Sequence, residues 1–253
     1  MDADTPRAVE LSLPQAFLLL ATNDKDGRPE VPVFALRTTL AGAILAELDL
    51  LGAIELQGKH VRATGTAPAT DFQQELELIR GKSRPHTPKQ WVSMLEGRAE
   101  VQRVYEGMES LGVLERVGEG HRGWFRARRY AEKDHAPEAT LLGRIEAALG
   151  GAPYGPGAVG STAADGGAAE TATAEAGTPE GGSPETAKPR AKAPDDRTVA
   201  LIALLQAAGL LAKLFPAADK TWADELAKDY WPAHAVEDEL RLIRIAEEET
   251  MTM

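Results

Sequence analysis

Arginine and tryptophan alternate in the segment RGWFRARRY at residues 122–130. If this segment is a strand, its side chains point alternately to opposite faces. One face then carries Arg122, Trp124, Arg126 and Arg128. Phe125 falls on the other face, where we expect it to join the core. A tryptophan framed by arginines can pack under their aliphatic stems, contact a second copy of the chain, or anchor at lipid headgroups. The pattern alone leaves these three interpretations open.

The other reactive residue types show no catalytic spacing. The histidines are His60, His86, His121, His135 and His234. They do not form a ligand pattern, so we predict no metal site. The sequence has no glycine-rich phosphate loop and no nucleophile elbow. We interpret grouped carboxylates such as Glu75 and Glu77 as solvated helix faces. We therefore predict that the protein is not an enzyme, and we expect no cofactor.

The clearest element is a helix that begins near Leu36 and ends before Gly52. Its apolar residues recur at spacings of four, four and three, at Leu40, Ile44, Leu48 and Leu51. That spacing places them on one face of a helix. Glycine is typical of a helix end because it tolerates positive φ. Residues 53–56 and 61–63 then alternate like two short strands around a turn at 57–59, which predicts a β-hairpin.

Several other elements can be read from caps, turns and periodicity. Ser12 and Gln15 can form a capping box, and Asp71 is the expected cap of a helix that runs through Arg80. Residues 113–117 and 123–130 are expected to pair as a second hairpin around a glycine-rich turn. Asp195 or Asp196 can cap the helix that follows. Further helices are expected between residues 91 and 111, and at residues 197–214, 221–230 and 233–248.

Composition bounds the domain organisation. The chain has 253 residues and no cysteine, which excludes disulfides and cysteine-based zinc sites. Residues 1–10 lack the basic start and apolar run of a signal peptide, and we expect them to form a disordered tail. Residues 150–194 are low in large apolar side chains, so we predict a disordered insert. We interpret residues 11–149 and 195–249 as one domain, with a separate domain after residue 195 as the alternative.

Net charge and composition narrow the partners and the location. The formal net charge is −11, which disfavours a nucleic-acid partner. The most apolar stretch, residues 199–214, is too short and too interrupted to span a bilayer. We therefore expect a cytoplasmic protein that can associate peripherally with the inner face of the membrane. The abundance of alanine, glycine, proline and arginine favours a GC-rich bacterial source, such as an actinobacterium.

The stretch LAGAILAELDLLGAIEL, at residues 40–56, resembles a signature run of the Golgi phosphoprotein 3 family, of the form L-x-G-x-x-L-x-E-L-x-L-x-G-x-I/L-x-L. Further stretches resemble family motifs in the same order, at residues 11–20, 67–71, 89–92, 111–114 and 197–215. Together the resemblance covers roughly 11–149 and 195–245. It implies a mainly α-helical single domain, a helix bundle with surrounding amphipathic helices and two short β-hairpins.

The resemblance also implies a function. Eukaryotic relatives bind phosphatidylinositol 4-phosphate on Golgi membranes and act as adaptors for cargo enzymes. Their headgroup site uses a tryptophan, an arginine on the long second helix, and two arginines on a later helix. In this sequence the tryptophan position falls near Pro32, with Phe34 the closest aromatic, and the first arginine position falls on Ala41. The two later positions align with Arg98 and Val101.

Arg103 is a further basic residue on the later helix. The candidate headgroup-binding residues are therefore Phe34, Arg98 and Arg103. Arg98 and Arg103 stand five positions apart, roughly 140° around a helix, so they are poorly placed to hold one phosphate together. The resemblance also favours self-association through the 113–130 hairpin, since relatives associate there.

We therefore predict a non-enzymatic peripheral membrane adaptor that binds a phosphoinositide or another anionic phospholipid headgroup. One alternative is a protein-interaction module that has lost lipid binding. Another is a winged-helix DNA binder with an arginine-rich wing at 116–129. The acidic net charge and the lack of Arg and Lys along residues 104–111 count against DNA binding.

Overall fold

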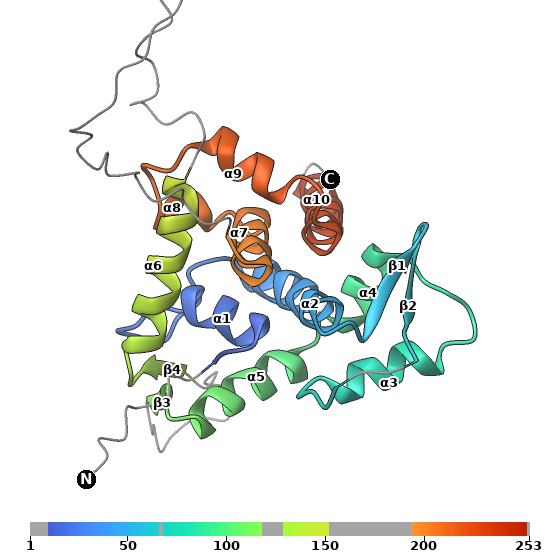
Figure 1. Ribbon diagram of the computed structural model, residues 1–253, viewed down its shortest axis with the longest axis horizontal. Coiled ribbons are helices and arrows are strands. Elements are labelled where there is room, and N and C mark those ends of the chain that lie inside the picture. Colours follow the sequence, from blue (N-terminus) through green and yellow to red (C-terminus); the bar gives the residue numbers. More distant parts are fainter. Residues whose placement is uncertain (1–9, 66–67, 118–128, 152–193, 252–253) are drawn as a thin grey trace, which may run out of the picture.

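The computed structural model describes residues 10–65, 68–117, 129–151 and 194–251. Helices dominate these residues, and the strands form two separate antiparallel hairpins (Figure 1). In chain order the elements are α1 (Leu13–Leu20), α2 (Val33–Leu50), β1 (Ile54–Gln57), β2 (His60–Ala63), α3 (Gln73–Gly81), α4 (Pro88–Leu95), α5 (Arg98–Ser110), β3 (Leu114–Val117), β4 (Arg129–Glu132), α6 (Ala136–Gly150), α7 (Asp196–Ala207), α8 (Leu211–Leu214), α9 (Lys220–Ala227) and α10 (Trp231–Met251). The predicted mainly α-helical single domain with two short hairpins is confirmed.

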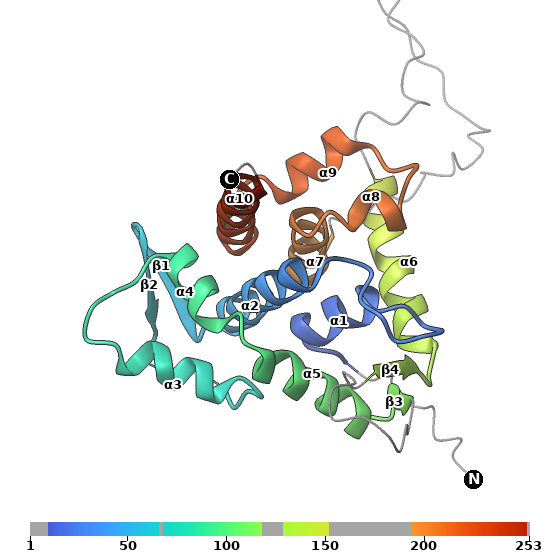
Figure 2. The same cartoon turned by 180° about the vertical axis from the view of Figure 1, so that it is seen from behind.

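Helix α2 is the centre of the fold. It contacts α1, α4, α7 and α10, which surround it when the molecule is viewed from either side (Figures 1 and 2). Leu40, Ile44 and Leu48 are buried, as their spacing predicts. Ala41, Ala43 and Leu45 on the other sides of the helix are buried too, so α2 has no solvated face along this stretch. A helix that is apolar all round is expected in a core rather than on a surface.

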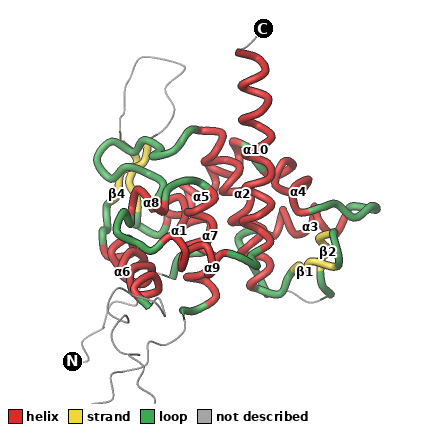
Figure 3. Tube along the Cα trace, turned by 90° about the horizontal axis from the view of Figure 1, so that it is seen from above, coloured by secondary structure: helices red, strands yellow, loops and turns green. Residues whose placement is uncertain are grey.

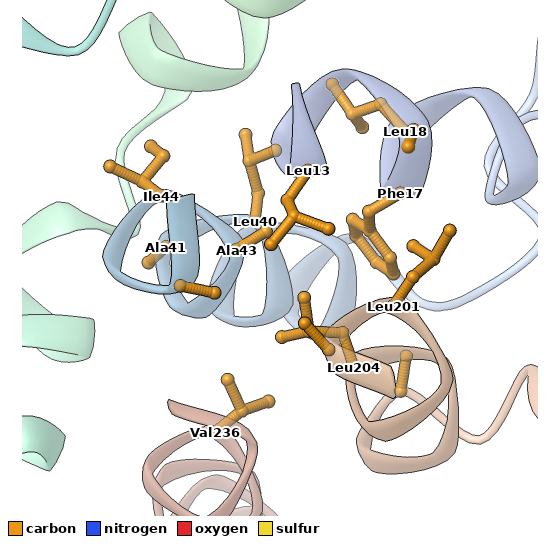
Figure 4. Packing of buried hydrophobic residues seen from close by; sticks show 14 of the residues in the cluster. Leu13, Phe17, Leu18, Leu40, Ala41, Ala43, Ile44, Leu201, Leu204 and Val236 are labelled. Atoms are coloured by element: carbon orange, nitrogen blue, oxygen red, sulfur yellow. The ribbon is translucent and has the colours of Figure 1, made fainter. Parts of the chain in front are cut away.

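The core joins segments that are far apart in the sequence. Figure 4 shows buried side chains of α1, α2, α7 and α10 facing one another around α2. The residues labelled there are Leu13, Phe17, Leu18, Leu40, Ala41, Ala43, Ile44, Leu201, Leu204 and Val236. Asp195, the predicted cap, starts α7 by accepting a hydrogen bond from the Thr198 backbone N–H at 2.9 Å. The elements that follow the predicted insert therefore complete the core begun by the N-terminal helices.

The first hairpin forms as predicted. Gly52 has φ of 66° and ends the turn after α2, and Gly58 has φ of 62° between β1 and β2. The strands pair antiparallel, with Ile54 opposite Ala63. Ile54 and Val61 are buried, so the hairpin attaches to the body through these two side chains.

The second hairpin differs from the prediction in its return strand. β3 pairs antiparallel with β4, with Leu114 opposite Glu132 and Val117 opposite Arg129. The described return strand therefore extends two residues beyond the predicted end at Tyr130. The Tyr130 ring stacks on Tyr105 of α5 with ring centroids 4.8 Å apart, which fixes this hairpin to the body. Residues 118–128 lie outside the described part.

Three expectations about helices were wrong or incomplete. Asp71 is not the cap of α3, because Phe72 occupies that position and Thr70 Oγ1 accepts a hydrogen bond from its N–H. The predicted helix at 197–214 is two helices, because Gly209 adopts φ of 75° between α7 and α8. Helix α6 was not predicted; its apolar residues are interspersed with glycine and alanine and give a weak periodic signal.

The last helix leaves the body of the molecule. The C-terminal part of α10 projects beyond the neighbouring helices in the view from above (Figure 3). Leu242 and Ile245 on this part are exposed. None of the described helices is long and apolar enough to cross a membrane. Residues 1–9 and 152–193 lie outside the described residues, so the expected disordered tail and insert stay predictions.

Candidate functional site

A pocket of about 400 Å³ opens between the first hairpin and the loop that joins α3 to α4. Both sides of the pocket are short, polar segments fixed to the body by a few contacts. The described residues that line it are Val61, Arg62, Ala63, Thr64, Gly65, Ile79, Arg80, Lys82, Ser83, Arg84, Pro85 and Trp91.

Backbone pairing holds the two sides together. The Val61 N–H donates to the His86 carbonyl at 3.0 Å, which extends the hairpin by one bridge to the α3–α4 loop. Thr64 Oγ1 donates to the Gly52 carbonyl at 2.6 Å, where α2 ends. The loop then enters α4 through a capping box, in which Gln90 N–H donates to Thr87 Oγ1 at 3.4 Å. The pocket walls are thus positioned by hydrogen bonds and do not depend on a ligand.

Four cations surround this pocket, and the described lining residues include no carboxylate. Arg80 pairs with Glu77 at 2.8 Å on the exposed face of α3. Among the described residues, Arg62, Lys82 and Arg84 have no ion-pair partner, and all three are exposed. The hairpin register places Glu55 opposite Arg62, but the Glu55 carboxylate accepts from Gln57 Nε2 at 2.5 Å. The pocket is therefore an electropositive site in an acidic chain.

Two buried nitrogens beside the pocket also lack partners. Trp91 is 1% exposed and contributes to the wall, and its Nε1–H has no hydrogen-bond acceptor among the described residues. Nδ1 of His86 is buried without a partner too, and the two rings lie with centroids 5.4 Å apart. The indole N–H can only donate, so an anion or a water would satisfy it. Guanidinium groups bind phosphate through paired N–H donors, so the chemistry of this pocket favours a phosphate.

The residues singled out from the sequence do not line this pocket. Phe34 is half-buried on the first turn of α2, and Arg98 is exposed as the first residue of α5. Arg98 has no ion-pair or hydrogen-bond partner among the described residues.

Arg103 is committed to neighbours inside the protein. It forms an ion pair with Glu75 of α3 and donates to Gln74 Oε1 at 2.8 Å. Glu75 is only 3% exposed, so Arg103 is its charge partner in a largely buried position. This contact fixes α5 to α3. Arg103 is thus neither a solvated residue nor free to hold a headgroup without breaking that pair.

One sequence position aligns with the arginine on the long second helix of family members, and this position lies inside the core. Ala41 is 0% exposed and lies on buried α2, where Figure 4 shows it among the core residues. Beside it on the same helix, Thr38 Oγ1 donates to Glu96 Oε2 at 2.7 Å across the junction between α4 and α5. A hydrogen bond from a hydroxyl to a carboxylate, together with apolar packing, therefore occupies this part of the fold.

The hairpin candidates cannot be placed. Arg122, Trp124, Arg126 and Arg128 lie outside the described residues, so their proposed role in oligomer or membrane contact stays a prediction. The described base of the hairpin, Leu114 and Tyr130, is buried against the body.

The basic pocket was missed from the sequence, although one signal was available. The stretch RGKSR at residues 80–84 holds three cations in five positions within a chain of net charge −11. The fourth cation, Arg62, comes from the hairpin, and only the fold shows that it lies beside the other three. A search for local basic density followed by a hairpin prediction would have pointed to this region.

Comparison with known proteins gives one assignment. No curated protein matches the chain. The model of the family described as Golgi phosphoprotein 3 (GPP34) matches residues 13–243. This match runs from the first residue of α1 into α10 and includes every element that surrounds α2. The chain therefore belongs to the Golgi phosphoprotein 3 family.

Proposed function

We propose that this chain is a non-enzymatic adaptor that associates peripherally with membranes and binds the phosphorylated headgroup of an anionic phospholipid, such as phosphatidylinositol 4-phosphate, in the basic pocket. One observation carries the proposal. Arg62, Lys82 and Arg84 surround one pocket without an ion-pair partner among the described residues, in a chain with eleven more acidic than basic residues. Such a cluster repels itself, and an anion relieves that repulsion.

The pocket has the size and composition for a headgroup. A volume of about 400 Å³ falls within the usual range for small-ligand pockets, roughly 300–1,000 Å³. The exposed donors come from two guanidinium groups and one ammonium group. Family membership supports an adaptor role over an enzymatic one. The positions of Phe34, Arg98 and Arg103 support a different placement of the headgroup from the one that resemblance alone suggested.

The test is co-sedimentation with phosphatidylcholine vesicles that contain or lack phosphatidylinositol 4-phosphate. Removing two cations with Arg62→Ala and Arg84→Ala is expected to lower the apparent affinity. At about 1 kcal/mol for each cation near an anionic surface, the loss is roughly 30-fold. The matched control is Arg144→Ala with Arg241→Ala, which removes two exposed cations from α6 and α10 and leaves the same net charge.

Each outcome decides between the functions considered. A large loss for the pocket variant and a small one for the control supports the proposal. Equal losses would show non-specific attraction between the whole protein and the vesicle. No binding by the parent chain at low salt would favour a protein-interaction module without a lipid site. A parallel assay with duplex DNA tests the winged-helix alternative, for which the arginines of the predicted wing at 116–129, and not the pocket cations, should matter.

A further inference from the structure

Four titratable side chains from three segments meet beside the base of the second hairpin. Asp24 lies in the turn between α1 and α2, Glu132 ends β4, His135 precedes α6, and Glu138 is on the first turn of α6. Each offers one oxygen or nitrogen atom, and these four atoms all lie within 4.8 Å of one another. Figure 1 shows β4 leading directly into the lower end of α6, where two of these segments join.

Backbone geometry brings the Asp24 turn to this place. Gly27 has φ of 62°, and a Cβ atom there would lie 2.6 Å from the Tyr130 carbonyl oxygen. Only glycine therefore allows the turn to lie directly on the backbone of β4. Asn23 stabilises the turn, since its Oδ1 accepts from the N–H groups of Lys25 and Asp26 at 3.1 and 3.2 Å. The cluster is thus assembled by the main chain and not by its own charges.

Glu132 is the unusual member of the cluster. Its side chain is 1% exposed, and one oxygen contacts His135 Nδ1. The other oxygen, Oε1, is buried and accepts from no N–H or hydroxyl group of the described residues; apart from His135, only a protonated Glu138 carboxyl could donate to the Glu132 carboxylate. Buried carboxylates are normally paired or bound to a metal. Within the described residues no lysine or arginine forms an ion pair with Asp24, Glu132 or Glu138.

The electrostatics of this cluster call for an added positive charge. His135 is 71% exposed and supplies at most one positive charge against three carboxylates.

We propose that Asp24, Glu132, His135 and Glu138 bind a divalent cation. One imidazole nitrogen with three carboxylate oxygens suits a first-row ion such as Mn²⁺ or Zn²⁺ better than Mg²⁺ or Ca²⁺. Ligand atoms about 2.0–2.2 Å from a tetrahedral Zn²⁺ lie roughly 3.3–3.6 Å from one another. Within the observed limit of 4.8 Å, the exposed side chains of Asp24 and His135 would move inward by about 1 Å to complete the site. The ion gives the Glu132 carboxylate the partner that it lacks.

The ion would join the turn after α1, the end of β4 and the start of α6. It would thereby fasten the base of the second hairpin to the body in addition to the Tyr105–Tyr130 stack. This site is independent of the basic pocket, which lies beside the first hairpin. Sequence patterns alone do not indicate the site, because Asp24 is distant along the chain from the other three ligands and only one histidine takes part.

The test uses the untagged full chain after treatment with a chelator and dialysis. Mn²⁺ binding is measured by the loss of the free-ion electron paramagnetic resonance signal, and Zn²⁺, Mg²⁺ and Ca²⁺ are compared by calorimetry and by the shift in Tm. We expect one ion per chain, a rise in Tm with Mn²⁺ or Zn²⁺, and a weaker effect of Mg²⁺ and Ca²⁺. An ion that binds the folded chain and not the unfolded one raises Tm, and above Kd the rise grows with the logarithm of the free ion concentration.

The variants separate the site from general attraction to an acidic protein. Glu138→Gln and His135→Ala each remove one ligand and are expected to weaken Mn²⁺ binding at least tenfold. Glu146→Gln changes an exposed carboxylate further along α6 and is expected to change nothing. His135 is exposed, so its variant keeps the fold even if a change at buried Glu132 does not. Equal affinity in Glu138→Gln and Glu146→Gln, or no binding of any of the four ions by the parent, would overturn the proposal.

Discussion

Arg197 and Glu47 form a bidentate ion pair between α7 and α2, with Arg197 Nη1 2.7 Å from Glu47 Oε2 and Nη2 3.0 Å from Oε1. The Leu13 N–H at the start of α1 also donates to Oε2, at 2.7 Å. One largely buried carboxylate therefore connects three helices from opposite ends of the chain. The hydrogen bonds to Glu47 raise the pKa of Arg197, so its guanidinium group stays charged.

Removing one partner of this pair should lower the free energy of unfolding more than removing both. Arg197→Met leaves the Glu47 carboxylate, which is 5% exposed, with only the Leu13 N–H as a donor. Breaking a buried pair costs about 3–5 kcal/mol, whereas replacing both charges with apolar groups costs much less. We expect the free energy of unfolding in urea to fall strongly in Arg197→Met and to recover in part when Glu47→Leu is added. Additive losses in the double variant would contradict this coupling.

Gly42 is required by the close approach of α10 to α2. A Cβ atom at this position would lie 2.2 Å from Val236 Cγ2, a side chain that is itself fully buried. Alanine in a helix is normally favoured over glycine by about 1 kcal/mol, but overpacking a core costs about 1–3 kcal/mol. We therefore expect Gly42→Ala to lower the free energy of unfolding.

The matched control makes use of the same contact. Val236→Ala removes the methyl group that a residue at 42 would meet, at the cost of a small cavity. In the double variant the two changes should offset each other. We therefore expect its loss in free energy of unfolding to be smaller than the sum of the losses in the two single variants. If Gly42→Ala stabilises the parent chain, the packing interpretation is wrong.

Asp49 gives a pH-dependent prediction. It lies near the end of α2, accepts a hydrogen bond from Trp231 Nε1 at 3.2 Å, and has a pKa raised by burial. The charges of Asp49 and Glu47, after burial itself, also raise the pKa of the neighbouring Tyr230. Because the folded pKa of Asp49 exceeds the unfolded one, its ionised form destabilises the fold, and this penalty disappears as pH falls below both values.

Asp49→Asn keeps an oxygen for Trp231 and removes the charge. We expect a higher Tm than the parent at pH 7 and a smaller difference near pH 4, close to the ordinary aspartate pKa of 3.8. Asp238→Asn, at an exposed position of α10, serves as the control and should show no such trend. A lower Tm for Asp49→Asn than for the parent at pH 7, with a loss that fades toward pH 4, would show that the surroundings stabilise the ionised Asp49 instead.

The parts of the fold that could be predicted depend on short-range signals. The period of Leu40, Ile44 and Leu48 defines α2, and Gly52 marks its end, because helix geometry and positive φ leave local traces in a sequence. The same signals did not predict that the long apolar run at 197–214 forms two helices with one glycine between them. Gly209 divides that run because the chain turns there to bring α9 alongside α7, which no local pattern shows.

The candidate sites could not be predicted because their residues come from separate segments. Arg62 joins the basic stretch at 80–84 only through the bridge between Val61 and His86. Asp24 meets Glu132 only because Gly27 lets a turn lie on β4. In contrast, Arg103 had the right type and position for a headgroup ligand, but the fold pairs it with Glu75. Residue type and spacing therefore identified capable side chains without showing which of them are already occupied.

The difference between an unpaired arginine and one that is paired within the fold leads to a prediction about Arg98 and Arg103. Arg98 is exposed and unpaired among the described residues but lies outside the basic pocket, so Arg98→Ala should weaken binding to vesicles containing phosphatidylinositol 4-phosphate by less than the roughly fivefold, or about 1 kcal/mol, expected for each pocket cation. It should leave the free energy of unfolding unchanged, and its effect should fade as salt screens the charge. Arg103→Ala should do the reverse, since it leaves Glu75 buried without its partner and lowers the free energy of unfolding, with little change in vesicle binding of the folded protein. Co-sedimentation over a salt series and urea unfolding measure the two effects separately. If Arg103→Ala abolishes vesicle binding at unchanged stability, the headgroup lies on α5 as in the family resemblance, and the pair with Glu75 opens to admit it.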